Sequence, residues 1–248
     1  MAISYALVTG ANQGIGFEIA RGLGKLGFTP ILGCRNLVRA REAAEKFEKE
    51  NKVKAEIVQL DVTNDKSIND ALKKVEDLCR TSGGSFDLLV NNAGIGRAPG
   101  EGKSVREQYA AVLDTNVSSV AVMMDTFIPL LQKSTHKLGG HIINVSSTRG
   151  SLLLNVQNKV PPSRSIPYSV SKAALNLLTV DYARNWKGKV RINAICPGHC
   201  ASNLNGYSGH KTIEEGAQVV LQIAVAEDVG TAGYYQLEGT ERFTDAPF

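Results

Sequence analysis

The sequence is poor in the residues that build metal centres and disulfide frameworks. Its four cysteines, Cys34, Cys79, Cys196 and Cys200, form no CxxC pair, and its four histidines show no HxxxH spacing. Structural and catalytic metal sites need clustered ligands of these types, so no metal site is predicted. Cysteines without framework spacing are typical of reducing compartments, which favours a cytoplasmic location.

The sequence also lacks long apolar runs and blocks of like charge. No uninterrupted apolar stretch approaches the roughly 18 residues that a membrane span requires, and the first residues show no basic leader. The net charge is +4, with lysines and arginines scattered among acidic residues. Neither a membrane nor a nucleic acid is therefore a predicted partner.

Short apolar, β-branched segments alternate with longer helical patterns along the chain. The expected strands are Tyr5–Thr9, Thr29–Cys34, Ala55–Leu60, Leu88–Asn91, His141–Ser146, Arg191–Ile195 and Tyr234–Leu237. The expected helices are Gly14–Leu26, Val38–Glu50, Lys66–Cys79, Asp114–Gln132, Ser169–Trp186 and Thr212–Ala226. We predict one α/β domain over residues 1–248, a Rossmann-type, doubly wound, seven-stranded and mainly parallel sheet with helices on both faces. Prolines interrupt the pattern at Thr148–Pro167, which predicts a surface loop.

A glycine-rich turn is expected between the first strand and the first helix. Residues 9–16 read TGANQGIG, with glycines at 10, 14 and 16. Such glycines let the backbone approach a pyrophosphate, and the following helix N-terminus offers free N–H groups. The spacing differs from GxGxxG and the chain holds 24 glycines, so an ordinary tight turn is the alternative. The position after a strand favours dinucleotide binding.

The residues after the second and third expected strands bear on which dinucleotide binds. An acidic residue usually follows the second strand and binds the ribose 2′-hydroxyl, but here Arg35 stands there, with Arg39 one helical turn later. Guanidinium groups pair with phosphate, which favours NADP(H) over NAD; the alternative is two arginines that only solvate a helix start. Asp61 either accepts from the adenine amino group or N-caps the next helix.

Tyr168 and Lys172 form a YxxxK motif. On a helix this spacing places both side chains on one face. A free phenol has a pKa near 10, and a reduction of three units by the ammonium would correspond to about 4 kcal/mol. We therefore expect Tyr168 to act as a general acid or base near neutral pH.

With these motifs the sequence resembles the short-chain dehydrogenase/reductase family over nearly its whole length. The resemblance rests on TGxxxGIG at 9–16, Asn91-Asn92-Ala93-Gly94, Asn116, Ser146-Ser147 and Tyr168/Lys172, followed by Cys196-Pro197-Gly198. Within the family, Arg35 with Arg39 and the segments at 59–63 and 214–217 are most like NADPH-dependent carbonyl reductases.

The resemblance implies a role for each matched residue. Tyr168 would donate a proton to the carbonyl oxygen, and Lys172 would lower its pKa and hold the nicotinamide ribose. Ser147 would hydrogen-bond the substrate oxygen, and Asn116 would anchor a proton-relaying water. Residues expected at the cofactor are Gly10, Asn12, Gln13, Gly14, Ile15, Gly16, Arg35, Arg39, Asp61, Val62, Asn91, Ala93, Gly94, Pro197, Gly198 and Ser202. Alternatively, Ser147 caps a strand end and Asn116 is a polar group inside a helix that bonds to the backbone.

The predicted activity is hydride transfer between NADP(H) and a small-molecule carbonyl or alcohol substrate. The alternatives are an NAD-dependent alcohol or hydroxysteroid dehydrogenase and a non-catalytic NADP(H)-binding sensor. Gly96–Ser104, Arg149–Ile166 and His199–Lys211 should form the substrate walls, and their composition favours a neutral carbonyl compound. Family members often dimerise through helices matching two of those expected here, so a homodimer or a monomer is expected.

Overall fold

One sheet of eight strands organises the protein. The computed structural model describes residues 3–163, 165–237 and 242–248. The strands are β1 (Ser4–Thr9), β2 (Thr29–Cys34), β3 (Glu56–Gln59), β4 (Ser85–Asn91), β5 (His141–Val145), β6 (Arg191–Cys196), β7 (Tyr234–Leu237) and β8 (Phe243–Asp245). Their order is β3-β2-β1-β4-β5-β6-β7-β8, and all neighbours are parallel except β7 and β8. The chain reverses its direction across the sheet between β1 and β4, where open α/β sheets form their ligand crevice.

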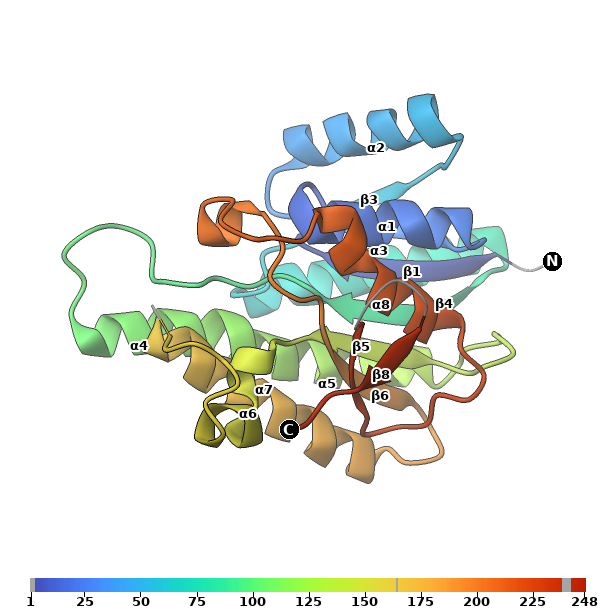
Figure 1. Ribbon diagram of the computed structural model, residues 1–248. Helices are drawn as coiled ribbons and strands as arrows, with labels where there is room; N and C mark the ends of the chain where they lie inside the picture. The colour runs from blue at the N-terminus through green and yellow to red at the C-terminus, as the bar shows by residue number, and fades with distance from the viewer. Residues whose placement is uncertain (1–2, 164, 238–241) are drawn as a thin grey trace.

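Helices cover both faces of the sheet (Figure 1). They are α1 (Gly14–Lys25), α2 (Leu37–Asn51), α3 (Asp65–Ser82), α4 (Val105–Leu113), α5 (Ser119–Leu131), α6 (Leu152–Val156), α7 (Ile166–Asn185) and α8 (Ile213–Val225). Helices α1, α2 and α8 contribute to one apolar cluster and α3, α5 and α7 to another. Within β1, Val8 belongs to the first cluster and Leu7 to the second. Burial on both faces explains why the parallel strands are continuously apolar, and the predicted doubly wound fold is confirmed.

The predicted count of seven strands is wrong by one. The additional strand, β8, has three residues and pairs antiparallel with β7 alone. Two of its residues, Thr244 and Asp245, are exposed. A strand this short and polar produces no apolar periodicity that a sequence pattern can detect.

The helix predicted at Asp114–Gln132 begins earlier than expected. The chain is helical from Val105 to Leu131, as α4, a π-helical turn η1 (Asp114–Ser118) and α5. Among the described residues this is the one helix long and apolar enough, by length and composition, to cross a membrane. Our prediction counted uninterrupted apolar runs and did not anticipate it. The helix packs on β4 and on α3 and α7, and a core helix of a soluble fold passes the same test.

The predicted loop at Thr148–Pro167 contains regular structure. A 3-10 turn, η2 (Thr148–Gly150), is followed by α6, and α7 begins with Pro167 in its first turn. Proline is tolerated there because its missing N–H has no intrahelical partner. Ser151 caps α6 by accepting from the Leu154 N–H at 3.2 Å. A five-residue helix is too short to show the periodicity on which the prediction depended.

Candidate active site

Helix α7 brings Tyr168 and Lys172 together at the end of β5. The Nζ atom of Lys172 lies 5.6 Å from the centre of the Tyr168 ring. It donates a hydrogen bond of 2.7 Å to the Val145 carbonyl, while the lysine is buried and Tyr168 is half-buried. A Cβ built on Gly150 would lie 2.4 Å from the Lys172 carbonyl carbon. Glycine at this position therefore lets η2 pack directly on the α7 backbone beside the pair.

Ser147 lies between β5 and η2, with its side chain at Tyr168. Its Oγ accepts from the Arg149 N–H at 3.3 Å, so Ser147 does cap the following turn. Its hydroxyl is also a hydrogen-bond partner of the Tyr168 phenol and lowers the pKa of that phenol. The structure thus places the Ser147 and Tyr168 hydroxyls next to each other and near the buried amine of Lys172.

Burial dominates the proton affinities of this pair. It raises the pKa of Tyr168 to about 12, against the smaller lowering effects of the Ser147 hydrogen bond and the Arg149 charge. Burial also lowers the pKa of Lys172 to about 8. The expected reduction of the Tyr168 pKa by Lys172 is therefore wrong for the protein alone. Lys172 loses its proton at a lower pH than Tyr168, so no ammonium is present where the phenol would ionise.

Asn116 occupies the π-helical turn η1, and its side chain makes three hydrogen bonds. Its Oδ1 accepts from the Ile95 N–H at 2.9 Å, and its Nδ2 donates to the Ile95 carbonyl at 2.9 Å and to Ser171 Oγ at 3.0 Å. A Cβ built on Gly94 would lie 3.1 Å from Asn116 Oδ1 and 3.8 Å from Lys172 Nζ. Asn116 thus fixes the chain after β4 beside the lysine. Two of its three bonds go to the Ile95 backbone and one goes to the Ser171 side chain, and π-turns are frequent at functional sites.

The glycine turn after β1 has the geometry that its sequence predicts. Gly10 and Gly14 have φ values of 67° and 61°, which favour glycine. A Cβ on Gly16 would lie 2.4 Å from Asn92 Nδ2 and 2.6 Å from the Gly10 carbonyl oxygen. Gln13 is the N-cap of α1 and makes no side-chain cap hydrogen bond. Together with the half-buried Asn12 and Ile15, the turn presents backbone N–H groups that an anion can bind.

The two asparagines after β4 have different surroundings. Asn92 donates from Nδ2 to the Thr9 carbonyl at 2.8 Å, and Thr9 Oγ1 accepts from the Asn92 and Ala93 N–H groups at 3.0 and 2.9 Å. Asn91 is buried and donates to Asn144 Oδ1 at 2.9 Å. The Asn91 amide therefore holds β4 to β5. Asn92 is the residue that our sequence reasoning missed, since adjacent asparagines give no signal of which one joins the glycine turn.

Val62, Asn91 and Ala93 nevertheless line one small hollow between the ends of β1, β3 and β4 and the η1 turn. Thr9 and Thr115 complete its polar edge. The predicted cofactor residues at the ends of β3 and β4 are thus neighbours in space. This position is the sheet's switch point, where open α/β sheets bind their ligands.

Arg35 and Arg39 are exposed at the end of β2 and the start of α2. Asn36 caps α2 by accepting from the Val38 and Arg39 N–H groups at 2.9 and 3.1 Å. Within residues 3–163, 165–237 and 242–248, no ion pair includes either guanidinium group. Neither cation has an acidic partner among the described residues, and both follow β2, whose Gly33 carbonyl accepts from the Gly10 N–H of the glycine turn at 2.8 Å.

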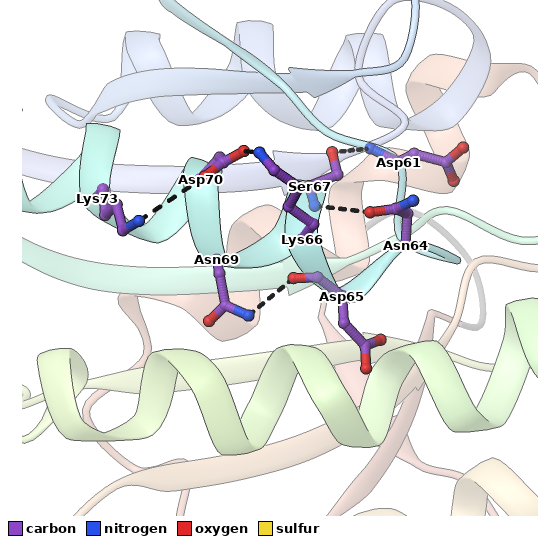
Figure 2. A network of polar contacts seen from close by, with 8 residues as sticks. All are labelled: Asp61, Asn64, Asp65, Lys66, Ser67, Asn69, Asp70 and Lys73. Carbon is purple, nitrogen blue, oxygen red and sulfur yellow. Dashed lines mark hydrogen bonds and ion pairs between the residues drawn. The ribbon is translucent and has the colours of Figure 1, made fainter.

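Asp61 does not cap α3, which removes one of its two predicted roles. Asn64 is the cap and accepts from the Ser67 N–H at 2.9 Å. The Asp61 N–H is bonded to Ser67 Oγ at 2.9 Å, while its carboxylate points away from α3 (Figure 2). Only Oδ1 has partners among the described residues, namely the N–H and hydroxyl of Thr63. The other carboxylate oxygen, Oδ2, has no hydrogen-bond partner in the described part of the chain.

Cys196, which sequence reasoning did not assign to the site, joins the loops after β5 and β6. Its Sγ accepts from the Thr148 N–H at 3.2 Å and from the Gly198 N–H at 3.4 Å. Gly198 has a φ of 84° and lies beside the half-buried Pro197. Farther along, Ser202 caps a 3-10 turn, η3 (Asn203–Asn205). The predicted nicotinamide-side residues thus lie on a loop tethered to the Ser147 turn.

The three predicted substrate walls meet at Gly96. Ser165 Oγ donates to the Gly96 carbonyl at 2.6 Å, and Leu204 Cδ1 would lie 3.8 Å from a Cβ on Gly96. Residue 164 of the second wall lies outside the described residues.

Among all the residues that the structure describes, no group of three or more His, Cys, Asp and Glu side chains is placed to hold a metal ion.

Comparisons with known proteins identify the family of this chain. A family model described as short chain dehydrogenase matches residues 4–213. The chain is 35% identical to the short-chain dehydrogenase anuI of Penicillium roqueforti, over 88% of this chain and 87% of the relative. It is 30% identical to salutaridine reductase of Papaver somniferum, over 93% of both chains. The structure of NADPH-bound carbonyl reductase from chicken fatty liver superposes with a TM-score of 0.80, covering 95% of this chain and 97% of that one at 26% identity. The chain therefore belongs to the short-chain dehydrogenase family, a family of oxidoreductases that act on carbonyl and alcohol groups.

Proposed function

We propose that this protein transfers hydride between NADP(H) and a carbonyl or alcohol substrate, with Tyr168 as the proton donor in reduction. The observation that carries the proposal is the meeting of the Ser147 and Tyr168 hydroxyls beside the buried amine of Lys172. A carbonyl oxygen placed between the two hydroxyls would receive two hydrogen bonds where negative charge develops. The raised pKa keeps Tyr168 protonated at neutral pH, and a protonated phenol is the form that donates.

The residues present fit a dinucleotide that carries a 2′-phosphate. The uncapped N–H groups of α1 and the close approach at Gly16 suit a pyrophosphate. Arg35 and Arg39 supply cations for the extra phosphate, and the open oxygen of Asp61 can accept from an adenine amino group. When bound, NADP(H) supplies the hydride. The NADPH-bound state of the chicken carbonyl reductase supports this preference.

Lys172 holds its position through Val145 and still has donors to offer. An ammonium carries three N–H groups, of which one is used on the Val145 carbonyl. The remaining donors can bind the ribose hydroxyls of the nicotinamide half. In this arrangement Lys172 orients the cofactor, while Ser147 orients the substrate oxygen and Tyr168 moves the proton.

The test measures NADPH oxidation with aldehydes, ketones and quinones. Wild-type turnover together with loss of turnover in Tyr168→Phe would support the proposal and leave the non-catalytic sensor without support. The rise in melting temperature caused by NADPH, compared with that caused by NADH, shows which cofactor binds more tightly. If Arg35→Asp changed neither of these two rises, NAD would be favoured. The cytoplasmic location and the homodimeric or monomeric state stay predictions.

A further inference from the structure

Arg149 is a cation on the wall of the proposed site. It belongs to η2, two residues after Ser147, and its own N–H donates to Ser147 Oγ at 3.3 Å. The next residue, Gly150, packs directly on the backbone of Lys172. The turn that carries Arg149 is therefore fixed against the segment of α7 that carries the proposed proton donor.

Arg149 is half-buried, and its side chain has one hydrogen-bond partner among the described residues. Its Nη1 donates to the Pro161 carbonyl at 2.5 Å, whereas a guanidinium has five N–H donors. None of the ion pairs between described residues includes it. Its charge acts to lower the pKa of Tyr168, against the larger effect of burial. A cation without an acidic partner among the described residues has donors left for a ligand.

Pinning the loop does not by itself require a charge at this position. Asn155 Nδ2 donates to the carbonyls of Arg149 and Ser151 at 3.1 and 2.7 Å. Ser151 Oγ donates to the Phe248 carbonyl at 3.0 Å. Neutral side chains thus anchor α6 on both sides, and the Pro161 contact uses one donor of Arg149 without neutralising its charge.

We infer that Arg149 binds a second oxygen acceptor on the substrate, a carbonyl or carboxylate oxygen within a few bonds of the reacting carbonyl. The inference rests on the proposed function, because it assumes that the reacting oxygen lies between Ser147 and Tyr168. It names vicinal dicarbonyl compounds and 2-oxo acids as the favoured substrate class. It departs from the expectation of a neutral carbonyl compound in one respect, because 2-oxo acids carry a negative charge at neutral pH.

The experiment compares three aromatic compounds of similar size: a phenyl alkyl ketone, the matching vicinal dione and phenylglyoxylate. The measured quantity is the ratio of kcat/KM for each acceptor-bearing compound to kcat/KM for the plain ketone. Arg149→Met should lower at least one ratio by about tenfold or more, because charge-assisted hydrogen bonds are the stronger class. Arg149→Lys should fall in between, since it keeps the charge and loses the planar donor geometry. Arg184→Met, an exposed position near the far end of α7, should keep the wild-type ratios.

The outcomes separate the inference from the function on which it rests. A fall confined to phenylglyoxylate identifies the acceptor as an anion, and a fall for both compounds identifies any oxygen acceptor. Equal losses for all three substrates in Arg149→Met would mean a purely structural role and overturn the inference. If plain-ketone reduction also depends on Tyr168, the proposed function survives that result. A wild-type enzyme that reduces none of the compounds overturns both.

Discussion

Replacing Lys172 by methionine should remove catalysis and make stability respond differently to pH. Lys172 is 5% exposed, and burial lowers its pKa from 10.5 to about 8. The unfolded chain keeps the ordinary value, so the difference is about 2.5 pH units, each worth about 1.4 kcal/mol. The buried charge therefore lowers the free energy of unfolding by roughly 3 kcal/mol at pH 7. This destabilisation is fully present below the folded pKa and disappears as the pH rises toward the unfolded pKa.

Methionine also leaves the Val145 carbonyl without the hydrogen bond that Nζ donates over 2.7 Å. An unsatisfied buried carbonyl costs about 1 to 3 kcal/mol, so the net gain for Lys172→Met at pH 7 is about 1 kcal/mol. The sharper quantity is the change with pH. Between pH 7 and about pH 9.5, wild type should gain roughly 2 kcal/mol relative to the variant, before tyrosines of the unfolded chain ionise.

Urea unfolding followed by the fluorescence of Trp186, the one tryptophan, measures both curves. Lys187→Met removes a positive charge at an exposed position just after α7 and serves as the control, with an expected difference within about 0.5 kcal/mol. Parallel stability curves for wild type and Lys172→Met across this pH range would refute the buried-charge reasoning. Unchanged turnover in Lys172→Met would refute its role in orienting the cofactor.

Three further predictions test the cofactor half of the site. Gly16→Ala should weaken NADPH binding by about tenfold or more, measured by fluorescence titration, because its Cβ would lie 2.4 Å from Asn92 Nδ2; wild-type affinity would contradict the close approach. Arg35→Asp should raise the KM for NADPH by about tenfold or more and should not raise the KM for NADH. Equal effects on the two KM values would remove the argument that Arg35 binds a 2′-phosphate. Asn64→Ala should lower the free energy of unfolding by about 1 kcal/mol, because it removes the cap of α3. Asp61→Ala should instead raise the KM for the dinucleotide. A loss of stability in Asp61→Ala and none in Asn64→Ala would make Asp61 the cap.

The sequence predicts those parts of the fold that repeat a strong pattern. Strands β1 to β7 are buried on one or both faces, so their apolar residues identify them, whereas β8 is three residues long and mostly exposed. The π-helical turn at Asp114–Ser118 depends on a shift in hydrogen-bond pairing, which apolar periodicity does not record. The cap of α3 could not be predicted either. Asn64 and Asp61 both precede this helix, and the backbone conformation of the folded chain makes Asn64 the cap.

The candidate site divides in a similar way. Ser147, Tyr168 and Lys172 were predicted from a motif and do lie together. The direction of the Tyr168 pKa was wrong, because desolvation is imposed by segments distant in sequence and a pairwise argument about Lys172 omits it. Cys196 was missed as a tether for the same reason, since its hydrogen-bond partner Thr148 is 48 positions away.

The strand order explains why motif order was nevertheless enough to locate the site. Parallel strands place all their carboxyl ends at one edge, so the residues after β1, β4, β5 and β6 meet there irrespective of their separation in the chain. The reversal between β1 and β4 then opens the crevice between the glycine turn and the Asn91–Gly94 turn. Topology thus determines which loops are neighbours, while packing determines proton affinities. A substitution that preserves every motif but exposes Lys172 to water should therefore keep the fold and bring the pKa of this lysine back toward 10.5, the value it has before burial.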